Sequence, residues 1–114
     1  VFDALAIRTA LAAHPAKVRV RIEGLAASAA TIVMLAADPG ELEIADGAML
    51  MIHSPWMLAA GDADDLRKTA GVLDQVEGEM VALYAARTKL SASRIKSLLD
   101  AETWMNAAQA VEQG

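Results

Sequence analysis

Ser28 and His53 are the two residues of this chain whose types and surroundings suit nucleophilic chemistry. Ser28 lies among small residues in the stretch 24–30, directly before the apolar run 31–35, and His53 follows the five apolar residues 48–52. A serine acts as a nucleophile only when a base removes its proton, and histidine is the side chain that most often does so. The pair therefore suits acyl transfer if the fold brings its members together.

Both residues also have an ordinary structural interpretation. A serine before a helix commonly caps the first turn, where unpaired backbone N–H groups can also support an anion. A histidine at the end of a buried strand can be a hydrogen-bonded core residue. His53, however, stands at the carboxyl end of an expected strand, where α/β folds place ligands and catalysis. The other histidine, His14, precedes Pro15 and is expected in a solvated loop.

A third group must orient the imidazole if the pair is catalytic, and carboxylates fill that role. Asp100 and Glu102 are the candidates near the C-terminus, and Asp38 and Asp46 are further options. The acidic run 62–65 is also available, but it is expected to be a solvated helix N-terminus that the helix dipole favours. No metal-ligand spacing and no glycine-rich phosphate loop accompany these residues, so no metal or cofactor is expected.

Apolar periodicity predicts the elements that must position these groups. The spacing predicts helices over 1–13, 28–37, from 62 or 64 to 87, 91–99 and 107–112, and strands over 18–22, 41–44 and 48–52. Residues 24–27 are expected to form a turn and 100–104 a connector. Strands 41–44 and 48–52 flank an Asp-Gly turn signal, so we expect a hairpin that returns the chain to the edge of Ser28. This order predicts an α/β layer with a helical arm.

Length and composition limit the classes of protein that this chain can represent. It has 114 residues, a net charge of −5 and no cysteine, which indicates one domain or part of one without disulfides or thiolate metal sites. No long basic run supports nucleic-acid binding. No apolar run reaches the roughly 18 residues that a membrane span needs. These features suit a cytoplasmic protein, and the two ends read as cut from a longer chain.

Three motifs, in order along the chain, carry a resemblance to a known family. They are GLAASAA at 24–30, MIHSPW at 51–56 and AETWMNAAQAVEQG at 101–114. Together they resemble the Clp protease proteolytic subunit family of serine peptidases, and most closely its phage and prophage branch, whose members are associated with head maturation. The resemblance covers essentially the whole chain.

The resemblance implies a role for each candidate residue. Ser28 would be the nucleophile and His53 the general base. Glu102 would be the catalytic acid, at a position where the family's housekeeping members carry Asp, with Asp100 as the fallback. The N–H of Ala29 would supply half of the oxyanion hole. In the family, the other half comes from a Gly-Gly segment before the first helix, which this sequence does not contain.

The resemblance also implies an architecture and partners. The fold would be a crotonase-like spiral of ββα units, with residues 1–114 as a single partial domain and about 62–90 as a protruding helical arm for oligomer contacts. Gly71 and Gly78, a heptad apart on that helix, are either tolerated weak points or sites of close approach by another backbone. Expected partners are a peptide or protein substrate, further copies in a homo-oligomeric ring, and an ATPase partner or phage head proteins.

Two alternatives remain open from the sequence. One is a catalytically impaired ring subunit or assembly scaffold of the same fold, which the Glu102 departure and the missing glycines motivate. The other is an acyl-CoA enzyme, because crotonase-type folds share the spiral. The Ser28 and His53 pair argues against the second alternative, since that class needs no serine nucleophile.

Overall fold

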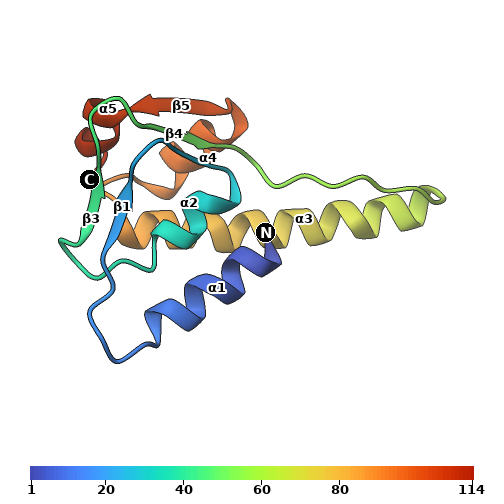
Figure 1. Cartoon of the computed structure of the whole chain (residues 1–114). Helices are drawn as coiled ribbons and strands as arrows, with labels where there is room; N and C mark the ends of the chain where they lie inside the picture. Colours follow the sequence, from blue (N-terminus) through green and yellow to red (C-terminus); the bar gives the residue numbers. More distant parts are fainter.

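Short strands alternate with helices along the chain, as the computed structural model of all 114 residues shows (Figure 1). The elements are α1 (Phe2–Ala12), β1 (Val20–Ile22), β2 (Leu25–Ala27), α2 (Ala29–Met34), β3 (Leu42–Ile44), β4 (Met49–Ile52), α3 (Ala63–Arg87), α4 (Ala92–Asp100), β5 (Thr103–Asn106) and α5 (Ala107–Glu112). The expected mixed α/β class is confirmed. Helix α2 ends earlier than expected, and residues 35–37 form turns instead.

The strands form two small sheets, and successive windings of the chain supply a strand to each. β1 pairs in parallel with β3 in a two-stranded sheet, while β2 pairs in parallel with β4 in a second sheet. The first winding is therefore β1, β2 and α2, and the second is β3, β4 and α3. Parallel strands need a crossover between them, and α2 with its following turns provides it in both sheets. This arrangement agrees with a spiral of ββα units.

Two expectations from the sequence are wrong: a hairpin between strands 41–44 and 48–52, and a turn over all of residues 24–27. β3 and β4 do not form a hairpin, because each pairs with a strand of the first winding in a different sheet. Gly47, with φ of 82°, bends the chain from one sheet to the other without reversing it onto its neighbour. Residues 24–27 are not only a turn, because Leu25–Ala27 is strand β2. Its alanines have little strand preference of their own, so pairing with β4 decides its conformation.

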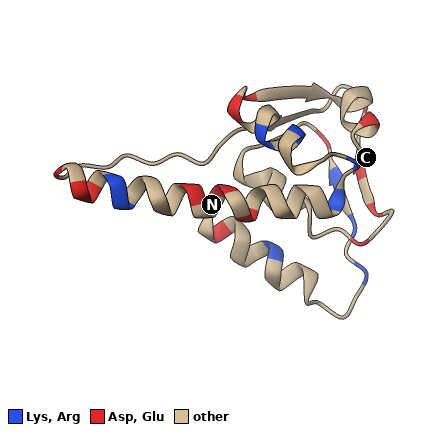
Figure 2. Cartoon of the chain, turned by 180° about the vertical axis from the view of Figure 1, so that it is seen from behind, with Lys and Arg blue, Asp and Glu red and all other residues tan.

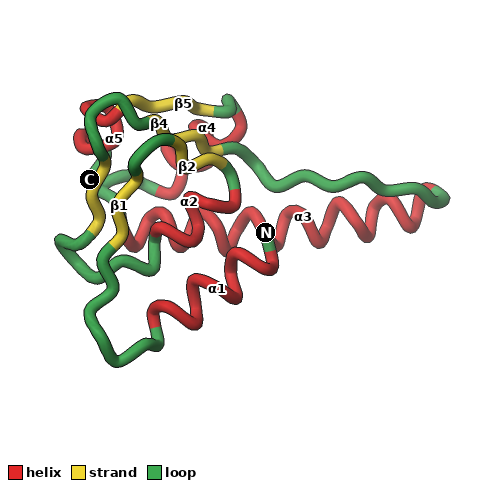
Figure 3. Tube along the Cα trace, viewed as in Figure 1, coloured by secondary structure: helices red, strands yellow, loops and turns green.

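Residues 100–104, expected to be a connector, also contain part of a strand. β5 begins at Thr103 and pairs antiparallel with β4, so β4 lies in the middle of the order β2-β4-β5. This central place explains why Leu50, Met51 and Ile52 are buried. The apolar run 48–52 was correctly expected to be a buried strand. Figure 3 shows these strands gathered at one end of the molecule, beside helices α2, α4 and α5.

The core lies between the sheets and helices α2, α3 and α4. Its largest fully buried apolar side chains are Ile32 and Leu35 from the first helical crossover and Ile95 and Leu99 from α4. Thr31 is buried among them and donates and accepts hydrogen bonds with its hydroxyl. Burial of four such aliphatic side chains is worth roughly 1.5–3 kcal/mol each, and this core fixes the position of α2.

Helix α3 has a buried half and a protruding half. Val76, Met80 and Tyr84 are buried against the core, whereas the N-terminal half extends away from it beside the loop that follows β4 (Figure 1). A capping box between Asp62 and Asp65 starts the helix, which accounts for the acidic run 62–65. Both acidic and basic residues occur along the protruding half of α3, up to its tip (Figure 2). No helix in the chain is both long enough and apolar enough to cross a membrane.

The single tyrosine of the chain allows its burial to be measured directly. Burial raises the pKa of Tyr84 to about 12, with the hydrogen bond to Thr31 opposing the shift. We expect the phenolate absorbance to stay silent through pH 10, the ordinary value, while the helical circular dichroism persists. Because the folded pKa is the higher one, the stability contributed by Tyr84 is complete below pH 10 and is lost between pH 10 and about 12. Ionisation at pH 10 with the helices intact would contradict this burial, and Tyr84→Phe should abolish the signal.

Candidate active site

Ser28 stands at a sharp turn between β2 and α2. Its φ of 55° and ψ of −120° lie in a region that residues other than glycine rarely adopt, at a cost of about 1–3 kcal/mol. The turn is held because the Ser28 N–H donates to the Met51 carbonyl at 2.9 Å, which extends the β2–β4 ladder by one residue. Small neighbours, Ala27 and Ala29, leave room for this turn. The serine side chain consequently projects away from the helix that it precedes.

The Ser28 hydroxyl bonds to His53 rather than to the helix. Ser28 occupies the N-cap position of α2, but its side chain makes no capping hydrogen bond. Its Oγ lies 2.7 Å from Nε2 of His53, which follows the last residue of β4 and is half-buried. When Nε2 carries no proton, the hydroxyl donates to it and the imidazole can accept that proton. The structure therefore brings together the two residues that the sequence singled out, and the capping interpretation of the Ser28 side chain is wrong.

A small cavity opens beside this pair. It has a volume of about 150 Å³, and Ile32, Met80 and Trp56 form apolar walls around Ser28 and His53. This is below the roughly 300–1,000 Å³ of cavities that enclose a whole small-molecule ligand. A space of this size next to a polar pair suits one side chain of a longer substrate.

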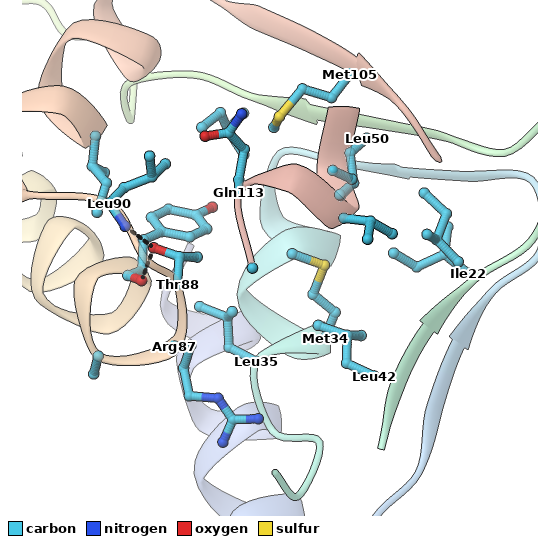
Figure 4. Close-up of a pocket in the computed structure, with 18 of the residues that line it drawn as sticks. Ile22, Met34, Leu35, Leu42, Leu50, Arg87, Thr88, Leu90, Met105 and Gln113 are labelled. Carbon is cyan, nitrogen blue, oxygen red and sulfur yellow. Dashed lines mark hydrogen bonds between the residues drawn. The ribbon is translucent and has the colours of Figure 1, made fainter. Parts of the chain in front are cut away.

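A larger cavity of about 620 Å³ lies elsewhere and contains no such pair. Figure 4 shows its apolar lining, including Ile22, Leu50 and Met105, which come from β1, β4 and β5. The one cation on its wall, Arg87, donates to the carbonyl of Ala37. Neither Ser28 nor His53 contributes to this lining, so the smaller cavity is the better candidate for chemistry.

The carboxylates expected to orient His53 make no hydrogen bond with it. Asp100 accepts from Lys96 Nζ at 2.5 Å, and its Oδ1 lies 3.3 Å from Ser54 Oγ, whose proton goes to Glu77 at the shorter distance of 2.5 Å. The Lys96 hydrogen bond holds the pKa of the Asp100 carboxyl below its usual value. Glu102 is exposed in the turn between α4 and β5. Asp38 accepts instead from the Val18 N–H, so it too is engaged elsewhere.

Glu102 and His53 nevertheless adjoin the same end of one strand ladder. β4 and β5 pair antiparallel, and their last pair joins Ile52 to Thr103. His53 directly follows β4 and Glu102 directly precedes β5, so each is one residue beyond this last pair. Glu102 also has a positive φ, 49°, which among non-glycine residues it shares only with Ser28.

Ala29 and two polar contacts complete the surroundings of the pair. As the first residue of α2, Ala29 has an N–H group without an intrahelical acceptor. Thr31 Oγ1 donates to the Ser28 carbonyl at 2.5 Å, and Ser54 Oγ donates to Glu77 at 2.5 Å. Neither Thr31 nor Glu77 was expected from the sequence to belong to the site. The signal available was a lone hydroxyl three residues after Ser28 in an otherwise apolar run, which is too common to be specific.

Other ionisable residues show no sign of a metal centre. His14 is exposed in the loop after α1, as expected, and its Nδ1 accepts from the Ala16 N–H at 3.1 Å. Nowhere do three or more His, Asp or Glu side chains gather closely enough to hold a metal ion.

Comparison with known proteins gives a family for this fold and this pair. The model of the family described as Clp protease matches the chain over all of residues 1–114. The chain belongs to the Clp protease family.

Individual relatives support the family membership at moderate identity. The chain is 32% identical over 95 residues to ATP-dependent Clp protease proteolytic subunit 1 of Protochlamydia amoebophila, across 82% of this chain and 46% of that protein. It is 30% identical over 91 residues to the ATP-dependent Clp protease proteolytic subunit of Bacteroides fragilis, across 80% of this chain and 44% of that protein. This Clp protease family chain thus spans about half the length of the curated relatives it matches.

The strained turn at Ser28 predicts a trade between stability and function. Glycine adopts a φ near 55° without a Cβ clash, so Ser28→Gly should raise the free energy of unfolding by about 1 kcal/mol over Ser28→Ala. Both variants lose the hydroxyl, which makes Ser28→Ala the matched control for the backbone effect. Denaturant unfolding followed by circular dichroism measures the difference. A Ser28→Gly protein no more stable than Ser28→Ala would mean that the turn carries no such strain.

Proposed function

We propose that this chain carries the catalytic pair of a serine endopeptidase, with Ser28 as nucleophile and His53 as general base. The observation that carries the proposal is the 2.7 Å contact between Ser28 Oγ and His53 Nε2 at a strained strand-to-helix turn. Relatives named as proteolytic subunits support it. A strained serine in contact with an imidazole is what acyl transfer to a hydroxyl requires.

The geometry suggests the order of events at the peptide bond. His53 Nε2 takes the Ser28 proton while Oγ attacks the carbonyl carbon, and the Ala29 N–H stabilises the oxyanion. The imidazolium then gives its proton to the leaving amine as the C–N bond breaks, which leaves an acyl-enzyme on Ser28. Water, deprotonated by His53, releases the acid product and restores the serine. The apolar walls of the small cavity would receive one side chain of the substrate.

We assign Glu102 as the acid that orients His53, with Asp100 as the fallback. The ladder of β4 and β5 supports Glu102, because its last pair, Ile52 and Thr103, adjoins His53 on one strand and Glu102 on the other. Asp100 is already engaged with Lys96. A carboxylate near Nδ1 would fix the tautomer that leaves Nε2 free for Ser28 and would stabilise the imidazolium.

The assembly and setting are also proposed from the family. We propose a homo-oligomeric ring in the cytoplasm, with an ATPase partner or phage head proteins, and with residues of about 62–90 forming the contact arm. Exposed Leu66 and Val72 on the protruding half of α3 support the arm assignment. Gly71 and Gly78 lie in open space on that helix, so another backbone could approach there. We also propose the phage and prophage branch of the family, on the three motifs at 24–30, 51–56 and 101–114.

A second candidate is a catalytically impaired ring subunit or assembly scaffold of the same fold. The observation that favours it is the lack of any hydrogen bond between His53 and a carboxylate. An imidazole without an orienting acid is a poorer base, although such contacts can tighten when substrate binds or the ring assembles.

Covalent labelling tests the proposed nucleophile. A fluorophosphonate probe should label Ser28 of the full-length protein, with the modified peptide identified by mass spectrometry. Ser28→Ala should abolish labelling, and His53→Ala should lower the rate on the order of 10⁴-fold because the base is lost.

Three outcomes of this labelling separate the candidates. Labelling that persists in Ser28→Ala would refute the nucleophile. Protein that assembles into rings but is neither labelled nor able to cleave peptides would favour the impaired subunit. A folded, labelled protein in which His53→Ala reacts as fast as the parent would refute the base.

The acid assignment has a test of its own. Glu102→Gln should lower kcat for peptide hydrolysis on the order of 10⁴-fold, because the amide no longer stabilises the imidazolium. Asp100→Asn is the matched control, because Asp100 lies two residues before Glu102. This substitution alters only an exposed ion pair with Lys96, so it should lower kcat by about tenfold at most. The reverse ranking of the two variants would identify Asp100 as the acid.

A further inference from the structure

One face of α3 contacts the surroundings of both Ser28 and His53. Glu77, Met80 and Tyr84 are spaced at i, i+3 and i+7 and therefore lie on the same side of the helix. Met80 is part of the cavity wall beside the pair. Glu77 accepts a hydrogen bond from Ser54, the residue after His53, and Tyr84 bonds to Thr31, three residues after Ser28.

The first contact is a directed chain of hydrogen bonds. Thr31 Oγ1 lies 2.5 Å from the Ser28 carbonyl oxygen and 2.5 Å from the Tyr84 hydroxyl. A carbonyl can only accept, so the one Thr31 proton goes to Ser28, and Tyr84 must donate to Thr31. Thr31 is 0% and Tyr84 4% exposed, so water does not compete for these bonds. Hydrogen bonds in series in such a setting strengthen one another.

This chain of bonds fixes a peptide plane that matters for catalysis. The Ser28 carbonyl and the Ala29 N–H belong to the same planar, trans peptide unit and point in opposite directions. Thr31 holds the carbonyl with its hydroxyl and also with its N–H, at 3.0 Å. Holding the carbonyl therefore also aims the Ala29 N–H, the proposed oxyanion donor. Without these contacts, the strained turn at Ser28 could relax by rotating this plane.

The second contact holds the residue next to His53. Ser54 Oγ donates to Glu77 Oε1 at 2.5 Å, and the Ser54 N–H donates to the Leu99 carbonyl at 3.2 Å. The other Glu77 oxygen pairs with Lys96 Nζ at 3.1 Å, which leaves the carboxylate 13% exposed. The backbone that carries His53 is thereby attached to α3 and α4.

We propose that the inner face of α3 positions both members of the pair: Tyr84 through Thr31 orients the Ser28–Ala29 peptide, and Glu77 through Ser54 orients His53. Tyr84, Thr31 and Glu77 are positioning residues, since none of them touches the reacting atoms. The proposal rests on the proposed function for its effect on rate, but the geometry that it describes exists in the resting protein and can be tested separately.

Removal of single hydroxyls tests the Tyr84 chain in the full-length protein. Tyr84→Phe and Thr31→Val should each lower kcat for a peptide substrate about tenfold and change KM less than twofold. The reason is that an oxyanion donor acts mainly in the transition state. Thr31→Ser keeps the hydroxyl and should retain most of kcat. The double variant should be no slower than the slower single variant, because both remove the same chain.

The outcomes are read with thermal unfolding and ring assembly measured alongside. Equal losses of kcat in Thr31→Ser and Thr31→Val, or additive losses of kcat in the double variant, would overturn the proposed role of the Tyr84–Thr31 hydrogen bonds. A loss confined to KM, or one that tracks thermal stability alone, would also overturn it. If the parent protein proves inactive, the proposed function fails but the positioning is still tested by hydrogen exchange over residues 25–34. Exchange should be faster in Tyr84→Phe and Thr31→Val than in Thr31→Ser, and identical exchange would overturn the proposal.

Glu77 is tested against a neighbour on the same helix. Glu77→Ala should slow fluorophosphonate labelling about fivefold to tenfold, whereas Glu77→Gln keeps an acceptor for Ser54 and should stay within twofold of the parent protein. Glu79→Ala removes an exposed carboxylate without a hydrogen bond and is the matched control. Equal slowing in Glu77→Gln and Glu77→Ala would assign the effect to the Lys96 ion pair and overturn the Ser54 route. If the parent is not labelled, hydrogen exchange over residues 50–56 replaces the labelling rate, with the same ranking expected.

Discussion

The pairing of β4 with strands on both sides is the constraint on which the candidate site depends. Its parallel ladder with β2 continues into the bond between the Ser28 N–H and Met51, and that bond holds the strained turn in place. Its antiparallel ladder with β5 ends at the pair Ile52–Thr103, which adjoins His53 on one strand and Glu102 on the other. A four-residue strand thus locates the serine, the histidine and the proposed acid. The helices contribute by burying this strand and by holding the backbone on either side of the pair.

Several parts of this arrangement could be predicted from the sequence because their signals are local. The long helix, the helix that Ser91 caps and the buried strand before His53 follow from periodicity and from capping residues. The meeting of Ser28 and His53 was also expected, but by way of a hairpin that does not exist. The correct route is a parallel crossover, which depends on pairing between distant strands. β2 and β5 were missed for the same reason, since strands of three or four residues have no periodicity to read.

The site also combines strain with rigidity. Ser28 and Glu102, the two non-glycine residues with positive φ, stand directly after β2 and directly before β5, the two strands that pair with β4. Such conformations persist only where neighbouring contacts over-determine them. For Ser28 these contacts are the Met51 carbonyl on one side and Thr31 on the other. No local sequence pattern predicts the bond that Tyr84 adds to Thr31, because the two residues are 53 positions apart along the chain.

The short segment after β4 carries both His53 and part of the wall of the small cavity. His53 is followed within three residues by Pro55 and Trp56, which line the small cavity. The proposed general base and part of the cavity wall therefore share one segment of backbone, which Ser54 anchors to α3. Under the proposed function, a substrate side chain that contacts Trp56 would act on the same segment that carries the imidazole. Selection of a substrate and readiness to react would then be linked through this one segment.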